Sequence, residues 1–330
     1  MTDTTATPPP STSLPATSLP ATARAVRLDG YGDRDVLDVR EVPMPHPGAG
    51  EVLVEVRAAG INPGEAIIRS GALHDRLPAT FPSGQGTDFA GTVVALGPGA
   101  EGVAVGDEVL GYSWTRSSHA THVVVPAAQV VPKPAGLAWE VAGSLDVAGT
   151  TAEAAVRGVR PVAGEVVAVS AASGGVGALV VQLLVRRGVT VLGIASRKSG
   201  PWLSAHGVVP VEYGDGLADR LRAAAPEGID AFIDLFGPEY LHLAVELGVP
   251  ADRIDTVVYS DAAGELGVRM AGAATLPDED VPQVLRDLAD LLARGEMELP
   301  IAATYPLDRV ADAFAELERR HSLGKIALVP

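Results

Sequence analysis

The segment from Val166 to Gly177 constrains the fold of this chain more than any other stretch, because it reads as a strand, a glycine-rich turn and the start of a helix. It matches the dinucleotide-binding fingerprint, with Ala172 in place of the first glycine. Gly174 lets the backbone approach a pyrophosphate, Gly177 lets the helix pack closely on the strand, and the helix N-terminus directs free N–H groups at the phosphates. The sequence therefore predicts a dinucleotide site, the alternative being a turn that serves packing alone. The expected contacts are Ala172, Gly174, Gly175, Val176 and Gly177.

The pattern of strands and helices differs between the two halves of the chain. From residue 23 to about residue 131, short alternating strands are separated by glycine turns, which indicates an antiparallel β domain. From about residue 147, apolar strands alternate with helices, which indicates a doubly wound parallel sheet and an α/β fold class. The strands expected there are 165–170, 189–194, 208–211, 230–234 and 253–259. A last strand at 326–329 does not fit easily into a completed sheet, so we expect it to return to the first domain.

The composition excludes several classes of function. A formal net charge of −16 argues against binding to nucleic acid or to an anionic membrane surface, since both need a basic face. The chain has no cysteine, which excludes disulfides, thiolate zinc sites, iron–sulfur clusters and a cysteine nucleophile. No stretch is long and apolar enough to span a bilayer, and the N-terminal residues lack the pattern of a secretory signal. We therefore expect a cytoplasmic protein with a small-molecule substrate.

The residues after the second strand of the parallel sheet indicate which dinucleotide is bound. An NAD site usually places an acidic residue there to bind the ribose hydroxyls. This chain has Ser196, Arg197 and Lys198 instead, and these cations would pair with a 2′-phosphate that a carboxylate would repel. The sequence therefore predicts NADPH, the alternative being an exposed loop with ordinary surface cations.

Several motifs in a fixed order resemble one protein family. They are Ala59-Gly60-Ile61-Asn62-Pro63, Gly86-Thr87-Asp88-Phe89-Ala90-Gly91, Val105-Gly106-Asp107-Glu108-Val109, Ala148-Gly149-Thr150-Thr151-Ala152, the glycine turn, and Gly324-Lys325-Ile326-Ala327-Leu328-Val329. Together they resemble the zinc-independent branch of the medium-chain dehydrogenase/reductase superfamily, and within it the NADPH:quinone oxidoreductases. The resemblance covers the chain from about residue 24 to its end.

The resemblance implies a domain plan. It predicts a GroES-like catalytic domain made of residues 23–146 and 285–330, and a Rossmann nucleotide-binding domain at 147–284, with NADPH in the cleft between them. Residues 1–22 are rich in Thr, Ser, Pro and Ala and are expected to form a disordered leader. The resemblance also implies a homodimer formed through edge strands of the Rossmann sheet.

Individual site residues follow from the same resemblance. It places Asn62 beside the nicotinamide and the substrate carbonyl, although an Asn before Pro63 is equally typical of a turn. It implies that Thr151 lines the nicotinamide, and that Lys198 and Tyr213 contact the 2′-phosphate region. Tyr213 has an alternative reading as the residue that closes the third strand.

The resemblance also bears on metal binding. In the related zinc alcohol dehydrogenases, metal ligands occupy the positions matching Asn62 and Thr87, and Asn and Thr are poor zinc ligands. His119 and His122 lie three residues apart, and we interpret them as surface or cleft residues and not as a metal pair. We therefore predict no metal site.

Without a metal, the resemblance implies hydride transfer from NADPH to a quinone or an α,β-unsaturated carbonyl. The reduced substrate must then receive a proton, and the candidates are His74, Tyr112 and water. Mitochondrial enoyl-thioester reductases of this superfamily carry a proton-donating Tyr where this chain has Leu73, which disfavours that activity. Two alternatives remain open: a pathway-specific ene reductase or related enzyme of secondary metabolism, and a non-catalytic NADPH-binding interaction protein.

Overall fold

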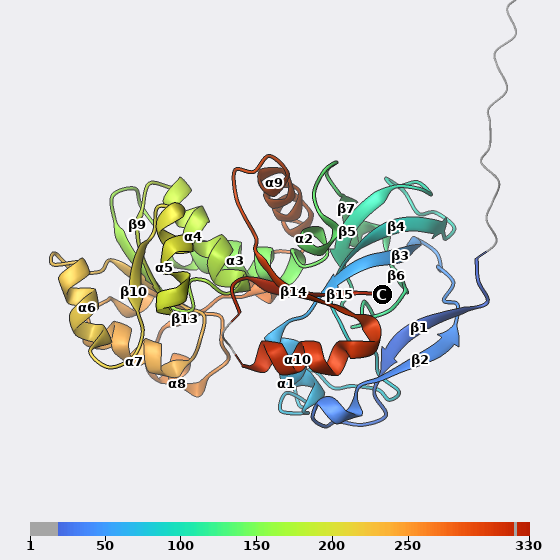
Figure 1. The fold of residues 1–330 in the computed structure, drawn as a ribbon, viewed down its shortest axis with the longest axis horizontal. Helices are drawn as coiled ribbons and strands as arrows, with labels where there is room; N and C mark the ends of the chain where they lie inside the picture. The colour runs from blue at the N-terminus through green and yellow to red at the C-terminus, as the bar shows by residue number, and fades with distance from the viewer. Residues whose placement is uncertain (1–18, 320–321) are drawn as a thin grey trace, which may run out of the picture.

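The computed structural model describes residues 19–319 and 322–330, and it contains two large sheets that lie side by side (Figure 1). The helix-rich half is on the left of Figure 1 and the half dominated by antiparallel strands is on the right. Most of the leader expected at residues 1–22 lies outside the described residues. This arrangement confirms the predicted fold class, a GroES-like β domain joined to a Rossmann-type parallel sheet.

The Rossmann sheet has six parallel strands in the order β10-β9-β8-β11-β12-β13. The strands are β8 (Val166–Val169), β9 (Thr190–Ala195), β10 (Val209–Glu212), β11 (Ala231–Asp234), β12 (Ile254–Thr256) and β13 (Arg269–Met270). The central strands are continuous apolar runs because both faces of the sheet are covered by helices. The chain order reverses between β8 and β11. The predicted glycine turn that follows β8, residues 170–177, is called the dinucleotide turn below, and it lies at this topological switch point.

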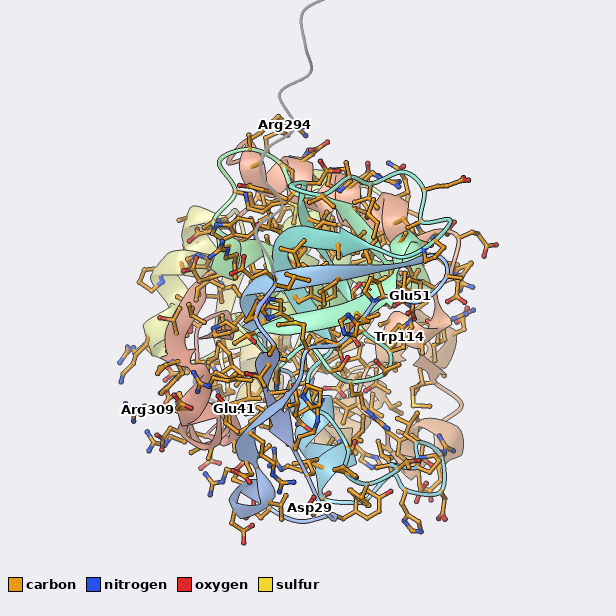
Figure 2. The ribbon with its side chains drawn as sticks, turned by 90° about the vertical axis from the view of Figure 1, so that its right-hand side faces the viewer. Asp29, Glu41, Glu51, Trp114, Arg294 and Arg309 are labelled. Atoms are coloured by element: carbon orange, nitrogen blue, oxygen red, sulfur yellow. The ribbon has the colours of Figure 1, made fainter. Side chains whose placement is uncertain are left out.

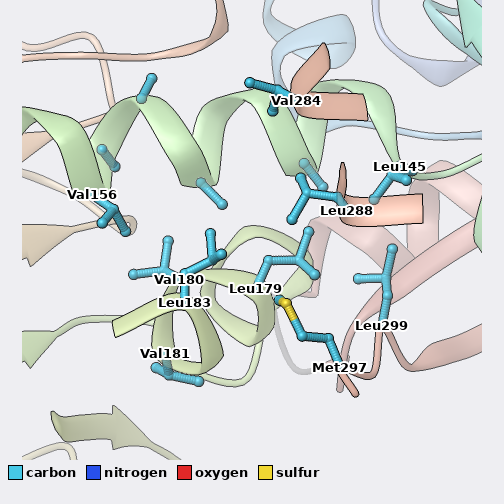
Figure 3. Packing of buried hydrophobic residues seen from close by; sticks show 14 of the residues in the cluster. Leu145, Val156, Leu179, Val180, Val181, Leu183, Val284, Leu288, Met297 and Leu299 are labelled. Atoms are coloured by element: carbon cyan, nitrogen blue, oxygen red, sulfur yellow. The ribbon is translucent and has the colours of Figure 1, made fainter. Parts of the chain in front are cut away.

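Helices cover both faces of this sheet. The α-helices of this half are α3 (Asp146–Val159), α4 (Gly175–Arg186), α5 (Gly200–Ala205), α6 (Leu217–Ala224), α7 (Pro238–Glu246), α8 (Asp261–Glu265) and α9 (Val281–Ala293). Leu179, Val180, Leu183 and Leu288 lie in the core between α3, α4 and α9, as Figure 3 shows. A second core, on the opposite face, is formed by side chains of α6, α7 and α8.

The GroES-like half contains a seven-stranded sheet in the order β14-β15-β3-β4-β5-β7, with β6 paired to β3. Its strands are β3 (Glu51–Gly60), β4 (Asp88–Leu96), β5 (Glu108–Tyr112), β6 (His122–Pro126), β7 (Val130–Pro132), β14 (Ile301–Pro306) and β15 (Lys325–Val329). A separate hairpin is formed by β1 (Thr22–Arg27) and β2 (Asp38–Pro43). The helices of this half are α1 (Pro63–Arg69), α2 (Trp139–Ala142) and α10 (Val310–Glu318). Short 3-10 turns occur at Arg34–Val36, Ala127–Gln129, Arg197–Ser199, Ala251–Arg253, Ala273–Thr275 and Leu307–Arg309.

The last strand returns to the first domain, as the sequence predicts. Strand β15 pairs antiparallel with the end of β3 and parallel with β14. Just before β15, Gly324 forms a parallel bridge with Gly174 of the dinucleotide turn. The C-terminal strand therefore connects the catalytic sheet directly to the nucleotide-binding turn.

One predicted element is shorter in the structure than the sequence suggests. A strand is expected at 253–259, whereas β12 ends at Thr256. There the Thr256 hydroxyl donates to Asp234 at 2.8 Å and accepts from the Val258 amide at 3.1 Å, so side-chain bonds replace the ladder. The predicted domain boundary at residue 285 falls inside α9, which is one continuous helix.

Candidate active site

The glycine turn has the geometry that a bound pyrophosphate needs. Ala171 adopts a left-handed conformation at φ 46°, and the backbone then extends through Gly174 into the first turn of α4. A Cβ on Gly177 would lie 2.2 Å from the Ala171 carbonyl oxygen, so only glycine fits there. The N-terminus of α4 therefore lies beside β8 and β9, and the Ala172 amide donates a hydrogen bond to the Ile194 carbonyl at 3.0 Å.

Gly175, predicted to contact the cofactor, also lies against Lys325. A Cβ at this position would lie 2.6 Å from the Cδ atom of Lys325, so the absence of a side chain lets the lysine stem pass beneath the turn. The Gly324 amide also donates to the Ser173 carbonyl at 2.9 Å. The dinucleotide turn therefore rests on the first residues of β15.

The predicted 2′-phosphate loop lies at the surface beyond β9. Arg197 and Lys198 are exposed, and neither side chain forms a hydrogen bond or ion pair with the part of the chain that the structure describes. Ser196 is partly buried, with its hydroxyl 3.2 Å from that of Ser199. The Tyr213 amide donates to the Ala195 carbonyl at 3.3 Å, and its ring is 44% exposed. The structure brings the four predicted residues together at one edge of the sheet, with two unpaired cations.

Asn62 lies in the middle of a buried polar cluster, between the end of β3 and the start of α1. Glu65, one turn into α1, accepts from the Asn62 amide at 3.0 Å, as in a helix capping box. The Asn62 side-chain Nδ2 donates to Glu65 at 3.3 Å and to Asp88 at 3.2 Å. Both N–H groups of the Asn62 side chain are therefore directed at carboxylates.

Lys325 completes this cluster from the opposite side. Its Nζ donates to the Asn62 Oδ1 atom, to the Ile61 carbonyl at 3.0 Å and to Asp88 at 3.4 Å. Since an ammonium has three N–H groups, all of them are used within the protein. The side chain is 5% exposed, so this cation is fixed in a buried position next to a buried carboxylate.

The carboxyl groups of the cluster are perturbed by one another. Burial, reinforced by the neighbouring Asp88, raises the pKa of Glu65 to about 7, although its bond from the Asn62 amide and the nearby Lys325 act in the opposite direction. Asp88 is fully buried and accepts from the Val147 amide at 2.9 Å at the start of α3. The cluster can therefore change its charge near neutral pH.

Tyr112 borders the same cluster. Tyr112, the last residue of β5, lies directly opposite Asp88 in the sheet and is 6% exposed. Burial, with Asp146 and Asp278 nearby, raises the pKa of Tyr112 to about 12. The ring of the half-exposed Trp114, which is labelled in Figure 2, lies 5.3 Å from that of Tyr112. Thr151 is buried in the first half of α3.

His119 borders this cluster, with its Nε2 atom 3.8 Å from a carboxyl oxygen of Glu65, whereas His74 and His122 lie outside it. His74 is on an exposed turn after α1, where its ring contacts the Gly71 carbonyl and Asp75, both at 3.0 Å. His119 is buried, its Nε2 lies 3.1 Å from the Gly60 carbonyl, and burial lowers its pKa to about 4. His122 is partly buried, and its ring contacts the Thr121 hydroxyl at 3.1 Å. The structure does not bring His74 together with Asn62, Tyr112 or the dinucleotide turn.

Sequence reasoning missed three members of the cluster: Lys325, Asp88 and Glu65. Lys325 and Asp88 stand inside the quoted motifs, but no role was predicted for them. One signal was available for Lys325, since it is one of only three lysines in the chain and begins an apolar strand. A buried strand tolerates such a cation only when a partner of opposite charge is also buried.

Comparison with known protein families matches both halves of the chain. Residues 48–156 match the alcohol dehydrogenase GroES-like domain, and residues 203–328 match the zinc-binding dehydrogenase domain. Within the described residues, no group of three or more His, Cys, Asp or Glu side chains is arranged to hold a metal ion. Similarly, no helix in residues 19–319 or 322–330 is long and apolar enough to cross a membrane.

Among known proteins, the synaptic vesicle membrane protein VAT-1 homolog of Rattus norvegicus is 30% identical, over 93% of this chain and 84% of that protein. The quinone oxidoreductase of the same organism is 28% identical, over 92% of this chain and 95% of its own length.

Two solved structures also match over nearly the whole chain. The quinone oxidoreductase from Coxiella burnetii has 27% identity and a TM-score of 0.84, covering 94% of this chain and 99% of that one. A mycobacterial protein solved in complex with NADPH has 26% identity and a TM-score of 0.80, covering 93% of this chain and all of that one.

Proposed function

This chain belongs to the medium-chain dehydrogenase/reductase superfamily of oxidoreductases, and we propose that it uses NADPH to reduce a quinone or an α,β-unsaturated carbonyl without a metal ion. The observation that carries the proposal is the contact between Gly324 and the dinucleotide turn. It joins the nucleotide-binding turn to the buried cluster of Asn62, Asp88 and Lys325.

The residues of the turn fit NADPH. The open N-terminus of α4 can accept a pyrophosphate, and the two exposed cations after β9 can pair with a 2′-phosphate. The NADPH complex of the mycobacterial structure supports the same choice. When bound, NADPH supplies a hydride at the nicotinamide ring.

The buried cluster supports a reaction without a metal. The Lys325 ammonium already lies between Asn62 and Asp88, where it donates to both. A second cation in the same place would be repelled by the ammonium. We propose that Lys325 supplies the positive charge at this centre and that Asn62 and Thr151 position the nicotinamide and the substrate.

A titration and an acceptor screen test the proposal. We expect NADPH to bind more tightly than NADH, and Lys198→Ala to weaken NADPH binding about three- to tenfold through the loss of a charge-assisted hydrogen bond. Arg286→Ala, which removes an exposed cation on α9, serves as the matched control. Turnover of a quinone or a linear enone by protein freed of metals with a chelator would support the reaction.

Two outcomes would contradict the proposal. If a chelator abolished turnover and added zinc restored it, the reaction would require a metal ion and the metal-free mechanism would be wrong. Tight NADPH binding without reduction of any acceptor would favour the non-catalytic interaction protein.

We also propose a homodimer formed through the Rossmann edge. Strand β13 is at the end of the six-stranded sheet, and Met270 on this strand is 43% exposed. A charged residue there, as in Met270→Glu, is expected to shift the mass measured by light scattering from dimer to monomer.

A further inference from the structure

Asp146, the first residue of α3, carries a buried carboxyl group that the proposed function leaves without a role. It is 2% exposed, and neither of its oxygens has a hydrogen-bond partner within residues 19–319 and 322–330. The other two carboxyl groups of the cluster, Glu65 and Asp88, both accept backbone amides. A buried polar group without a partner is costly, and in an active site it marks a place where a ligand completes the bonding.

The two nitrogen donors of the cluster, Lys325 and Asn62, have no N–H group to spare. The three N–H groups of Lys325 go to Ile61, Asn62 and Asp88, and the two side-chain N–H groups of Asn62 go to carboxylates. Neither residue can donate to a substrate oxygen without losing a bond that it already makes. Asp146, in contrast, has both of its carboxyl oxygens without a partner in the described residues.

The surroundings of Asp146 favour the protonated form of its carboxyl group. Burial and the Asp88 carboxylate on β4 raise the pKa of Asp146 well above its ordinary value, and Lys325 on β15 opposes this in part. Tyr112 on β5 also faces it, with Asp278 acting on the same phenol. A neutral carboxyl group has an O–H donor, as a general acid requires.

The two side chains considered as proton donors from the sequence are less suited to this step. The raised pKa of Tyr112 makes its phenol a weaker acid than an unperturbed one. His74 lies on an exposed turn, where Asp75 and the Gly71 carbonyl already engage its ring. A carboxyl group inside the cluster whose pKa is raised, as that of Asp146 is, is better placed to donate a proton than either of them.

We propose that Asp146 is the general acid that protonates the substrate after hydride transfer. This inference rests on the proposed function. A hydride from NADPH forms a new C–H bond at the β-carbon of the conjugated carbonyl, and the C=C electron pair moves onto the carbonyl oxygen. The Asp146 O–H bond then breaks, and its proton passes to that oxygen. The Asp146 carboxylate regains a proton from water once the product leaves, so each cycle consumes one NADPH, one acceptor and one proton.

The test compares Asp146→Asn with Asp255→Asn. Asp255 is a second buried carboxyl group, in β12, whose pKa burial raises to about 8 and which also has one oxygen without a partner in the described chain. We expect Asp146→Asn to bind NADPH as the wild type does but to lose about 100-fold or more in kcat, the usual share of general acid catalysis. The Asp255 variant should keep wild-type turnover.

The pH profile separates a proton donor from a merely structural residue. In the wild type, kcat should fall at high pH as Asp146 loses its proton, and Asp146→Asn should abolish this high-pH limb. Should Asp146→Asn fail to fold, Asp146→Ser removes the titrating group with a smaller side chain and is expected to lose the limb in the same way.

An infrared titration without NADPH supplies an independent readout. Wild-type protein should show neutral carboxyl bands that disappear as the pH rises, one absent from Asp146→Asn and another absent from Asp255→Asn. A turnover rate and pH profile unchanged by Asp146→Asn, in an enzyme whose wild type reduces acceptors, would overturn the role of Asp146 alone. A wild type that reduces no acceptor would overturn the proposed function, and with it this role.

Discussion

Two lysines of this protein occupy opposite environments. Lys325 is buried and uses all three of its N–H groups on Ile61, Asn62 and Asp88, whereas Lys198 is exposed and has no partner in the described part of the chain. The first is fixed by the fold before any ligand arrives, and the second is free to meet one. Fixed groups serve catalysis because they need no reorganisation, and free surface cations serve recognition of a charged ligand.

The largest effect is expected from Lys325→Met. Removing this ammonium leaves Asp88 and the Asn62 carbonyl buried without their partner, which typically costs about 3–5 kcal/mol of unfolding free energy. Urea unfolding measures this loss, and kcat should fall with it because Asn62 is no longer held. Lys198→Met should change the stability by less than about 0.5 kcal/mol, as exposed sites usually do. If Lys325→Met and Lys198→Met had the same unfolding free energy, the buried contacts of Lys325 would not stabilise the fold more than an exposed lysine does.

The next effect concerns how the buried cluster responds to pH. The pKa of Glu65 is raised to about 7, so the folded state holds its proton more tightly than the unfolded state does. The stabilisation is complete below the unfolded pKa near 4.5 and is lost as the pH rises towards 7, by an amount on the order of 3 kcal/mol.

Unfolding of Glu65→Gln across this pH range tests the point. The variant should lose the part of the slope that belongs to Glu65, whatever its absolute stability, because an amide does not ionise. Glu41→Gln, on the outer surface of β2 (Figure 2), should keep the wild-type slope. A wild type and Glu65→Gln with parallel curves between pH 4.5 and 7 would mean that Glu65 titrates as an exposed acid does.

The contrast between the two lysines also explains what the sequence could and could not predict. The dinucleotide turn, the parallel sheet and the returning strand follow from local patterns: an apolar run, glycines at fixed spacing, and an apolar strand left over at the C-terminus. The exposed cations after β9 could be predicted as a group because they are neighbours in the chain. The position of these cations depends only on strand β9 and the turn that follows it.

The buried cluster could not be predicted in the same way. Lys325 meets Asn62 across 263 positions and Asp88 across 237, so its contacts exist only once the C-terminal strand has paired with the sheet of the first domain. The predicted role of Asn62 likewise gave no indication that both of its side-chain N–H groups face carboxylates. Asp146 resembles an ordinary acidic residue at a helix N-terminus, and only its burial without a partner distinguishes it.

Gly175 links the dinucleotide turn to the buried lysine, because it lies in that turn and is next to the Lys325 side chain. In Gly175→Ala the new methyl group would meet the stem of Lys325 at 2.6 Å. Overpacking of this kind costs about 1–3 kcal/mol, which we expect to appear as a fall of roughly tenfold in kcat while the Kd for NADPH changes much less. Gly264→Ala in α8, where no atom lies within 4 Å, is the matched control and should be neutral. If Gly175→Ala weakened NADPH binding and left kcat unchanged, Gly175 would act by contacting the cofactor and not by making room for Lys325.

The smallest effect is expected at the exposed cations, and salt should reveal it. Arg197 and Lys198 would interact with a 2′-phosphate at the solvent-exposed surface, so added salt should screen their attraction for it. The hydrogen bonds of Lys325 are buried, and salt should affect them much less. The preference for NADPH over NADH should therefore shrink as salt rises, by about 1 kcal/mol or less, as is usual for exposed ion pairs. Titrations with both nucleotides at low and high salt measure this, and NADH serves as the internal control because it lacks the phosphate. If salt did not alter the preference for NADPH over NADH, the 2′-phosphate would be bound by buried groups instead. The assignment of cofactor recognition to Lys198 and of a catalytic role to Lys325 would then be wrong.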